Sequence, residues 1–150
     1  MMKIEGAAEK PTLSFEEVLD KYGSFAFTNV GTSMMPLIRQ GEDVMIIEKK
    51  GSERQKKYDV VLYRRGKYYI LHRILRVRKN DYVIAGDNCY TKERGIKDEQ
   101  IIGRLVAIER GGRHIDVRDR RYRAYVHLWC DFYIVRAAIL WCKSKLKPKR

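Results

Sequence analysis

Six short runs of apolar, aromatic and β-branched residues lie between residues 25 and 109, and turn-forming sequences separate them. The runs cover residues 25–30, 43–48, 60–63, 68–77, 82–85 and 101–109. The turns contain Gly41-Glu42-Asp43, Arg65-Gly66-Lys67, Lys79-Asn80-Asp81 and Gly111-Gly112. Several short strands at such intervals are typical of all-β architectures. We therefore expect a mainly β fold in which a mostly antiparallel sheet coils into a barrel-like core.

One short helix is predicted before the sheet. Ser14 can cap it, Glu17 completes a capping box three residues later, and Gly23 ends it. A chain of 150 residues fits one domain of ordinary size. We divide the chain into a helical lead-in at residues 1–22, a β-rich core at residues 23–112 and a basic, apolar helical tail at residues 113–150.

The composition changes within the tail. Residues 124–142 are mostly apolar and long enough for a helix, but His127, Asp131 and Arg136 interrupt them. A clean membrane-spanning helix needs about 20 consecutive apolar residues. We therefore expect a helix that lies in the plane of a membrane surface. The alternative is a C-terminal helix that packs on the core or on another subunit.

Most of the positive charge lies at the same end of the chain. Residues 110–150 contain twelve Lys and Arg against three Asp, and the whole chain has a net charge of +13. Such a segment suits either an anionic membrane surface or nucleic acid. Of these two partners we expect an anionic membrane surface, bound through residues 120–150, and no nucleic acid.

The sequence also bears on the compartment. The first six residues contain no apolar stretch of the length that a signal peptide or membrane anchor needs. Cys89, Cys130 and Cys142 are odd in number and lack the spacing of metal ligands, so neither a disulfide scaffold nor a structural zinc site is indicated. We expect a protein associated with the cytoplasmic side of a membrane, or a cytoplasmic one.

Ser33 stands in the segment Gly31-Thr32-Ser33-Met34-Met35-Pro36, just before a predicted strand. A serine is a poor nucleophile unless a base activates it. His72 is the candidate base, because strand alternation places it on one face with Ile70 and Ile74. A partly buried, neutral imidazole is what a general base requires. Ser33 and His72 are therefore candidate catalytic residues for acyl transfer, with backbone N–H groups around Ser33 as candidate oxyanion donors.

Asp87, in Ala85-Gly86-Asp87-Asn88, is the third candidate catalytic residue. Its carboxylate can orient an imidazole, although Gly-Asp-Asn is also an ordinary turn sequence. Glu93, six residues later, is a second acidic candidate for the same role. The remaining histidines, His114 and His127, are interpreted as structural.

These segments together resemble the type I signal peptidases. Residues 31–38 and 41–44 resemble the serine box of that family, residues 58–63 the strand before the base, and residues 71–74 the base box in its histidine form, found in the endoplasmic-reticulum and archaeal branch. Gly86-Asp87-Asn88 is similar to the Gly-Asp-Asn box, and residues 102–105 to the closing strand. The resemblance extends over residues 30–109.

The resemblance implies a β-rich peptidase in which Ser33 attacks a peptide carbonyl and His72 accepts the proton, without a cofactor. Asp87, Glu93 or neither residue supports His72. The implied reaction is cleavage of an extended protein segment at a small-residue site, through an acyl-enzyme. The implied partner is therefore a protein or peptide substrate. Family members usually carry an N-terminal membrane anchor, a role that residues 124–142 are expected to take in this chain.

Two other functions are consistent with the sequence. The same residues suit a soluble maturation protease for a small peptide. A nucleic-acid-binding β-barrel would account for the positive tail and for strand aromatics at Tyr63, Tyr68, Tyr69 and Tyr82. Such a module has no use for a Ser/His pair, so we expect an enzyme.

Overall fold

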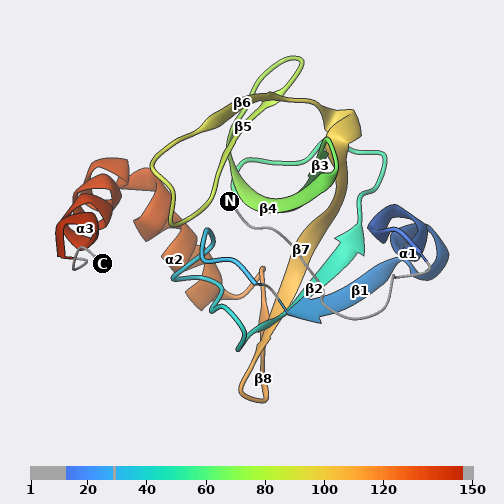
Figure 1. Ribbon diagram of the computed structural model, residues 1–150, viewed down its shortest axis with the longest axis horizontal. Helices are drawn as coiled ribbons and strands as arrows, with labels where there is room; N and C mark the ends of the chain where they lie inside the picture. The colour runs from blue at the N-terminus through green and yellow to red at the C-terminus, as the bar shows by residue number, and fades with distance from the viewer. Residues whose placement is uncertain (1–12, 29, 147–150) are drawn as a thin grey trace.

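The computed structural model describes residues 13–28 and 30–146. The start of the expected lead-in, the absence of an N-terminal anchor and the last four residues of the basic tail therefore concern parts of the chain outside the described residues. Figure 1 shows a curved sheet with α1 on one side and α2 and α3 on the other.

The fold is mainly β, as predicted, with eight strands in one antiparallel sheet. The strands are β1 (Ser24–Thr28), β2 (Val44–Lys49), β3 (Val60–Arg65), β4 (Tyr68–Val77), β5 (Tyr82–Ala85), β6 (Glu93–Ile96), β7 (Ile101–Arg110) and β8 (Arg113–Asp116). The helices are α1 (Phe15–Tyr22), α2 (Arg120–Asp131) and α3 (Tyr133–Leu146), with a short 3₁₀ turn, η1, at Asp98–Gln100.

The antiparallel sheet is open and is not closed into a barrel. Its strand order is β1-β2-β7-β3-β4-β5-β6, with β8 paired to β7, and the two end strands β1 and β6 do not pair with each other. β6 is only four residues long and contains Gly95 at a φ of 80°. A strand this short and irregular has few backbone N–H and C=O groups with which a further strand could pair.

The predicted helix before the sheet is confirmed as α1. The Ser14 side chain accepts a hydrogen bond from the Glu17 amide, and the Glu17 carboxylate accepts one from the Ser14 amide, so that both halves of the capping box form. Gly23 ends the helix in the left-handed conformation, at a φ of 76°. Phe15 then stacks on Phe25 of β1, with ring centroids 5.1 Å apart, which holds α1 against the edge strand.

Both faces of the central strands are buried. Leu62 of β3 and Leu71 of β4 belong to one apolar cluster, whereas Tyr63 and Ile70, their neighbours in sequence, belong to the other. Because side chains alternate along a strand, each cluster lies on its own face of the sheet. His72 shares the face of Ile70, as predicted, and Arg73 points to the opposite face.

The C-terminal segment differs from the single helical tail that the sequence suggests. Residues 113–116 form strand β8 on β7, and the helical part is divided into α2 and α3 at Phe132. Tyr122 and Val126 of α2 are buried in the cluster that contains Leu71, so this segment packs on the core, as the alternative interpretation expected. No helix among the described residues is both long enough and apolar enough to cross a bilayer.

Candidate active site

Ser33 lies in the loop between β1 and β2, and its side chain is buried. Met34 and Ile38 are fully buried beneath this loop. The far end of the loop is fixed by Asp43, whose carboxylate accepts a hydrogen bond of 2.8 Å from Arg110 Nε. Burial acts to raise the pKa of Asp43, but the hydrogen bonds outweigh it and lower that pKa. The loop that carries Ser33 is therefore held by buried apolar side chains and by the ion pair between Asp43 and Arg110.

His72 lies on β4 with a buried imidazole. Its Nδ1 atom is 3.4 Å from Glu93 Oε1 and 3.4 Å from the Tyr63 hydroxyl oxygen. The Tyr63 hydroxyl donates to the same Glu93 oxygen at 2.9 Å, and Arg65 forms an ion pair with the other oxygen. A carboxylate at Nδ1 favours the tautomer in which Nδ1 carries the proton and Nε2 is free to accept one.

Glu93 is held as a carboxylate by these neighbours. Hydrogen bonding with His72 is the largest influence, followed among the lowering effects by the bond from Tyr63 and the charge of Arg65. Together they lower the pKa of Glu93 to about 2, against the opposing effect of burial. Burial and the nearby Glu93 charge raise the pKa of Tyr63, so the phenol remains a hydrogen-bond donor at neutral pH.

Gly86 lies between the serine loop and the histidine. A Cβ atom at this position would lie 2.5 Å from the carbonyl oxygen of Ser33 and 3.1 Å from His72 Nε2. The Asn88 amide donates to the Ser33 carbonyl at 2.8 Å, and the Asn88 side chain donates to the Thr32 carbonyl at 3.1 Å. The Gly-Asp-Asn loop thus contacts both the backbone of the serine loop and the imidazole, and only glycine leaves room for these contacts at position 86.

The reactive atoms of the pair have no hydrogen-bond partner among the described residues. Ser33 Oγ and His72 Nε2 are both buried, and neither forms a hydrogen bond. Catalytic hydrogen bonds are often long in a protein without substrate and tighten when substrate binds. Buried polar atoms are normally paired, so two unsatisfied atoms in residues that both lie against Gly86 are an unusual arrangement.

Asp87 is not brought to His72. Its two carboxylate oxygens accept hydrogen bonds of 2.8 Å from Arg73 Nε and Nη2, and the Tyr125 hydroxyl donates to Oδ2 at 3.0 Å. Asp87 and Arg73 are both fully buried. The sequence names Asp87 and Glu93 as alternative supports for the imidazole, and the structure places Glu93 in that position.

Sequence reasoning did not identify the residues of α2 and α3 that hold this loop. Trp129 Nε1 donates to the Asp87 carbonyl at 2.8 Å. Arg136 Nη2 donates to the carbonyls of Gly86 and Cys89, at 2.6 Å each. In the sequence Arg136 is visible only as a charge within an apolar segment. Its burial indicates that this charge has a structural partner.

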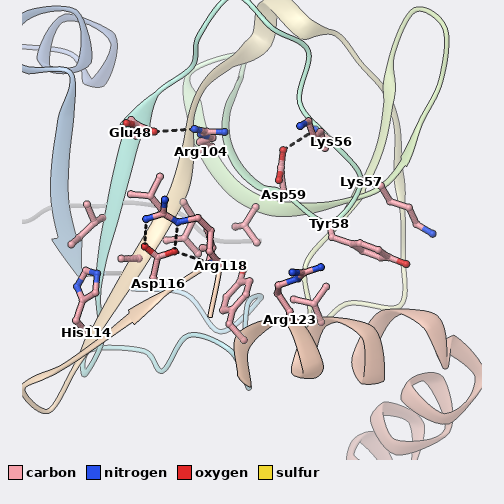
Figure 2. A pocket seen from close by; sticks show the side chains of 18 of the residues that line it. Glu48, Lys56, Lys57, Tyr58, Asp59, Arg104, His114, Asp116, Arg118 and Arg123 are labelled. Carbon is pink, nitrogen blue, oxygen red and sulfur yellow. Dashed lines mark hydrogen bonds and ion pairs between the residues drawn. The ribbon is translucent and has the colours of Figure 1, made fainter. Parts of the chain in front are cut away.

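A separate groove of about 940 Å³ lies between α2, the loop before β3 and the strands β2, β7 and β8 (Figure 2). Several of its charges are paired, with Arg104 bound to Glu48 at 3.1 Å and Arg118 bound to Asp116 at 2.7 Å. Ser33, His72 and Glu93 do not line this groove.

The two other histidines lie apart from the Ser33/His72 pair. His114 and His127 both line the groove of Figure 2 and are exposed. His114 pairs with Glu109, and His127 Nδ1 lies 2.8 Å from Asp131 Oδ2. Both contacts are local in sequence.

Within residues 13–28 and 30–146, no three His, Cys, Asp or Glu side chains are grouped so that they could hold a metal ion. Comparison with family models, with curated proteins and with solved structures finds no match for this chain. The chemistry of the site therefore rests on the geometry of Ser33, His72 and Glu93.

Proposed function

We propose that this chain is a serine endopeptidase of the signal-peptidase type, which cleaves an extended protein segment through an acyl-enzyme. One observation carries the proposal. Ser33 Oγ and His72 Nε2 are both buried without a hydrogen-bond partner among the described residues. Gly86 lies against the Ser33 carbonyl and His72 Nε2, and Glu93 lies at the other nitrogen of the imidazole. A nucleophile, a base and a residue that orients the base are the three parts of nucleophilic acyl transfer.

In the proposed reaction, His72 Nε2 accepts the proton of the Ser33 hydroxyl as Oγ attacks the carbonyl carbon of the scissile peptide. The carbon–nitrogen bond then breaks, and the imidazolium returns this proton to the leaving amine. Water, deprotonated by His72, hydrolyses the ester and restores the serine. Glu93 stabilises the imidazolium from the Nδ1 side. Backbone N–H groups around Ser33 are the candidate donors to the oxyanion.

One side of β4 lacks a neighbouring strand beside His72. β4 pairs with β3 over residues 68–73, whereas β5 pairs with β4 only from Arg73 onward. Among the described residues, the β5 side of residues 69–72 therefore has no strand partner. An extended peptide can add to such an edge through backbone hydrogen bonds. The substrate would then run past the imidazole.

We place this reaction at the cytoplasmic side of a membrane, or in the cytoplasm. Three cysteines without disulfide bonds suit a reducing compartment. A soluble maturation peptidase would use the same catalytic residues and would differ only in not binding lipid.

The nucleic-acid-binding alternative has less support. Tyr63 and Tyr82 are fully buried, so neither ring can stack on a base. The sheet is also open, which removes the barrel that this alternative assumed.

A fluorophosphonate probe tests the proposed function without a known substrate. The probe is expected to form one covalent adduct, and peptide mapping by mass spectrometry is expected to place it on Ser33, because only a base-activated serine reacts. Heat-denatured protein is the control and is expected to remain unlabelled. An adduct on the exposed Ser52 or Ser144, or no adduct at all, would contradict the proposal.

Glu93→Gln tests the positioning of His72. The amide cannot stabilise an imidazolium as a carboxylate does, so we expect kcat for peptide cleavage to fall roughly 10²- to 10⁴-fold with little change in KM. Glu48→Gln, which disturbs only an exposed ion pair with Arg104, is the matched control. An unchanged kcat in Glu93→Gln would show that Glu93 does not act on His72.

The same variant has a pH-dependent effect on stability. Because the folded-state pKa of Glu93 is about 2, below its ordinary value of 4.5, its carboxylate stabilises the fold fully above about pH 4.5 and loses this contribution as the pH falls toward 2. In urea denaturation, Glu93→Gln is therefore expected to be less stable than the wild type at pH 7, with a smaller difference at pH 3.

A further inference from the structure

We propose that the outward side of α2 and α3 is a docking surface for an anionic lipid bilayer, and that docking holds the catalytic loop in its active geometry. We call this surface the outer face. It consists of exposed apolar side chains at Leu128, Phe132, Ile134, Val135, Ile139, Trp141 and Leu146. The second part of the inference, the effect on the loop, rests on the proposed peptidase function.

The outer face is continuous along α3. Ile134 and Leu146 are 85% and 81% exposed, whereas Arg136 and Leu140 are buried on the opposite side of the same helix. Ile134 and Trp141 are two turns apart, and Val135 and Ile139 one turn apart, so these side chains form a broad apolar stripe. Figure 1 shows α3 at the edge of the molecule, beyond α2 and on the side away from α1. Nothing in the described fold covers this stripe.

The charges around the outer face favour an anionic bilayer as its occupant. Lys143 and Lys145 lie in the last turn of α3, and Arg120 and Arg121 are exposed at the start of α2. The only acidic residue of the two helices is Asp131, which is bound to Tyr58 and His127. Trp141 and flanking lysines are typical of helices that lie in the lipid headgroup region.

A second copy of the chain is a less favourable occupant. If two outer faces met, two surfaces that both carry net positive charge would be brought together. No acidic side chain on the two helices is available to compensate them, because Asp131 already has its partners. Lipid phosphates supply the missing negative charge.

The inner side of the same helices connects the outer face to the reactive pair. Arg136, which directly follows Val135, donates to the carbonyls of Gly86 and Cys89. Gly86 in turn separates the Ser33 carbonyl from His72 Nε2. A bilayer that holds α3 in place therefore also holds the loop that aligns Ser33 with His72. We expect the reactivity of Ser33 to rise when lipid is bound.

Vesicle binding tests the surface independently of any peptidase activity. The full chain is expected to sediment with vesicles of phosphatidylglycerol and phosphatidylcholine, and much less with phosphatidylcholine alone or in high salt. Ile134→Ser/Trp141→Ser is expected to lower the partition coefficient for anionic vesicles at least about tenfold. Tyr22→Ser/Val77→Ser removes exposed apolar side chains elsewhere and is expected to bind like the wild type.

The rate of fluorophosphonate labelling at Ser33 tests the effect on the site. Anionic vesicles are expected to raise this rate severalfold in the wild type but not in Ile134→Ser/Trp141→Ser, whose rate without vesicles is expected to match the wild type. Any of three results would overturn the docking surface. The chain does not bind vesicles, it binds both vesicle types equally, or it forms a dimer that the double substitution dissociates in analytical ultracentrifugation. Vesicle binding without a change in labelling rate would overturn the link to the loop.

The two proposals can fail separately. Loss of vesicle binding with Ser33 still labelled would refute the docking surface and leave the peptidase assignment in place. Vesicle binding by a chain that the probe never labels would refute the peptidase assignment and, with it, the effect on the loop.

Discussion

Ser33→Ala is expected to reduce kcat for peptide cleavage by at least about 10⁴-fold, because in the proposed mechanism the Oγ atom forms the acyl-enzyme and no other group replaces it. The same substitution is expected to leave the free energy of unfolding unchanged or slightly higher. The hydroxyl is buried and has no hydrogen-bond partner, so its removal abolishes a desolvation cost without breaking a bond. Cleavage assays and urea denaturation measure the two effects.

His72→Ala provides the matching test of the pair. We expect a loss of activity similar to that of Ser33→Ala, and the double variant is expected to be no less active than either single variant, since the two residues act as a unit. Ser24→Ala, at an exposed position on β1, is the control and should keep full activity. Multiplicative losses in the double variant, or cleavage that survives Ser33→Ala, would refute the mechanism.

Asp87→Ala is expected to lower the free energy of unfolding by about 3–5 kcal/mol. Asp87 and Arg73 are both fully buried and joined by two hydrogen bonds of 2.8 Å, so truncation leaves a guanidinium charge without its partner inside the fold. Urea denaturation at neutral pH measures this loss. Asp20→Ala, which breaks an exposed ion pair with Lys49, is the control and is expected to have little effect.

The same substitution separates a structural role for Asp87 from a catalytic one. If Asp87 acts only by holding Arg73 and the loop, the folded fraction of Asp87→Ala keeps measurable labelling by the fluorophosphonate probe. A variant with wild-type stability that is no longer labelled would instead make Asp87 a positioning residue for His72, contrary to the geometry.

Local sequence patterns predict most of the elements of this fold. The six expected strands correspond to β1, β2, β3, β4, β5 and β7, and the capping box at Ser14 and Glu17 marks α1. Local sequence patterns do not predict β6 and β8. Glu93-Arg94-Gly95-Ile96 has neither alternation nor β-branched residues apart from Ile96, so only its pairing with β5 makes it a strand. The open edge likewise depends on which strands pair, which local composition does not specify.

The sequence selects Ser33 and His72, and both lie against Gly86 in the fold, but the sequence does not decide which residue contacts the imidazole. Tyr63 could have been found, because a two-residue turn at Gly66-Lys67 places Val61 opposite His72 and Tyr63 diagonal to it across the β3–β4 hairpin. The choice between Asp87 and Glu93 has no such local signal. It depends on Arg73, which points to the opposite face from His72 and binds Asp87 there.

The burial of Arg136 against the carbonyls of Gly86 and Cys89 also has an evolutionary consequence. A substitution in residues 86–89 that shifts either carbonyl changes which side chains can pair with it from position 136. Substitutions at these positions are therefore expected to be rare and to occur together. The outward-facing positions of α3 make no such hydrogen bonds, so one apolar residue can replace another there. The two sides of α3 are then expected to diverge at different rates, the inner side constrained by its contacts with residues 86–89 and the outer side only by the surface that it contacts.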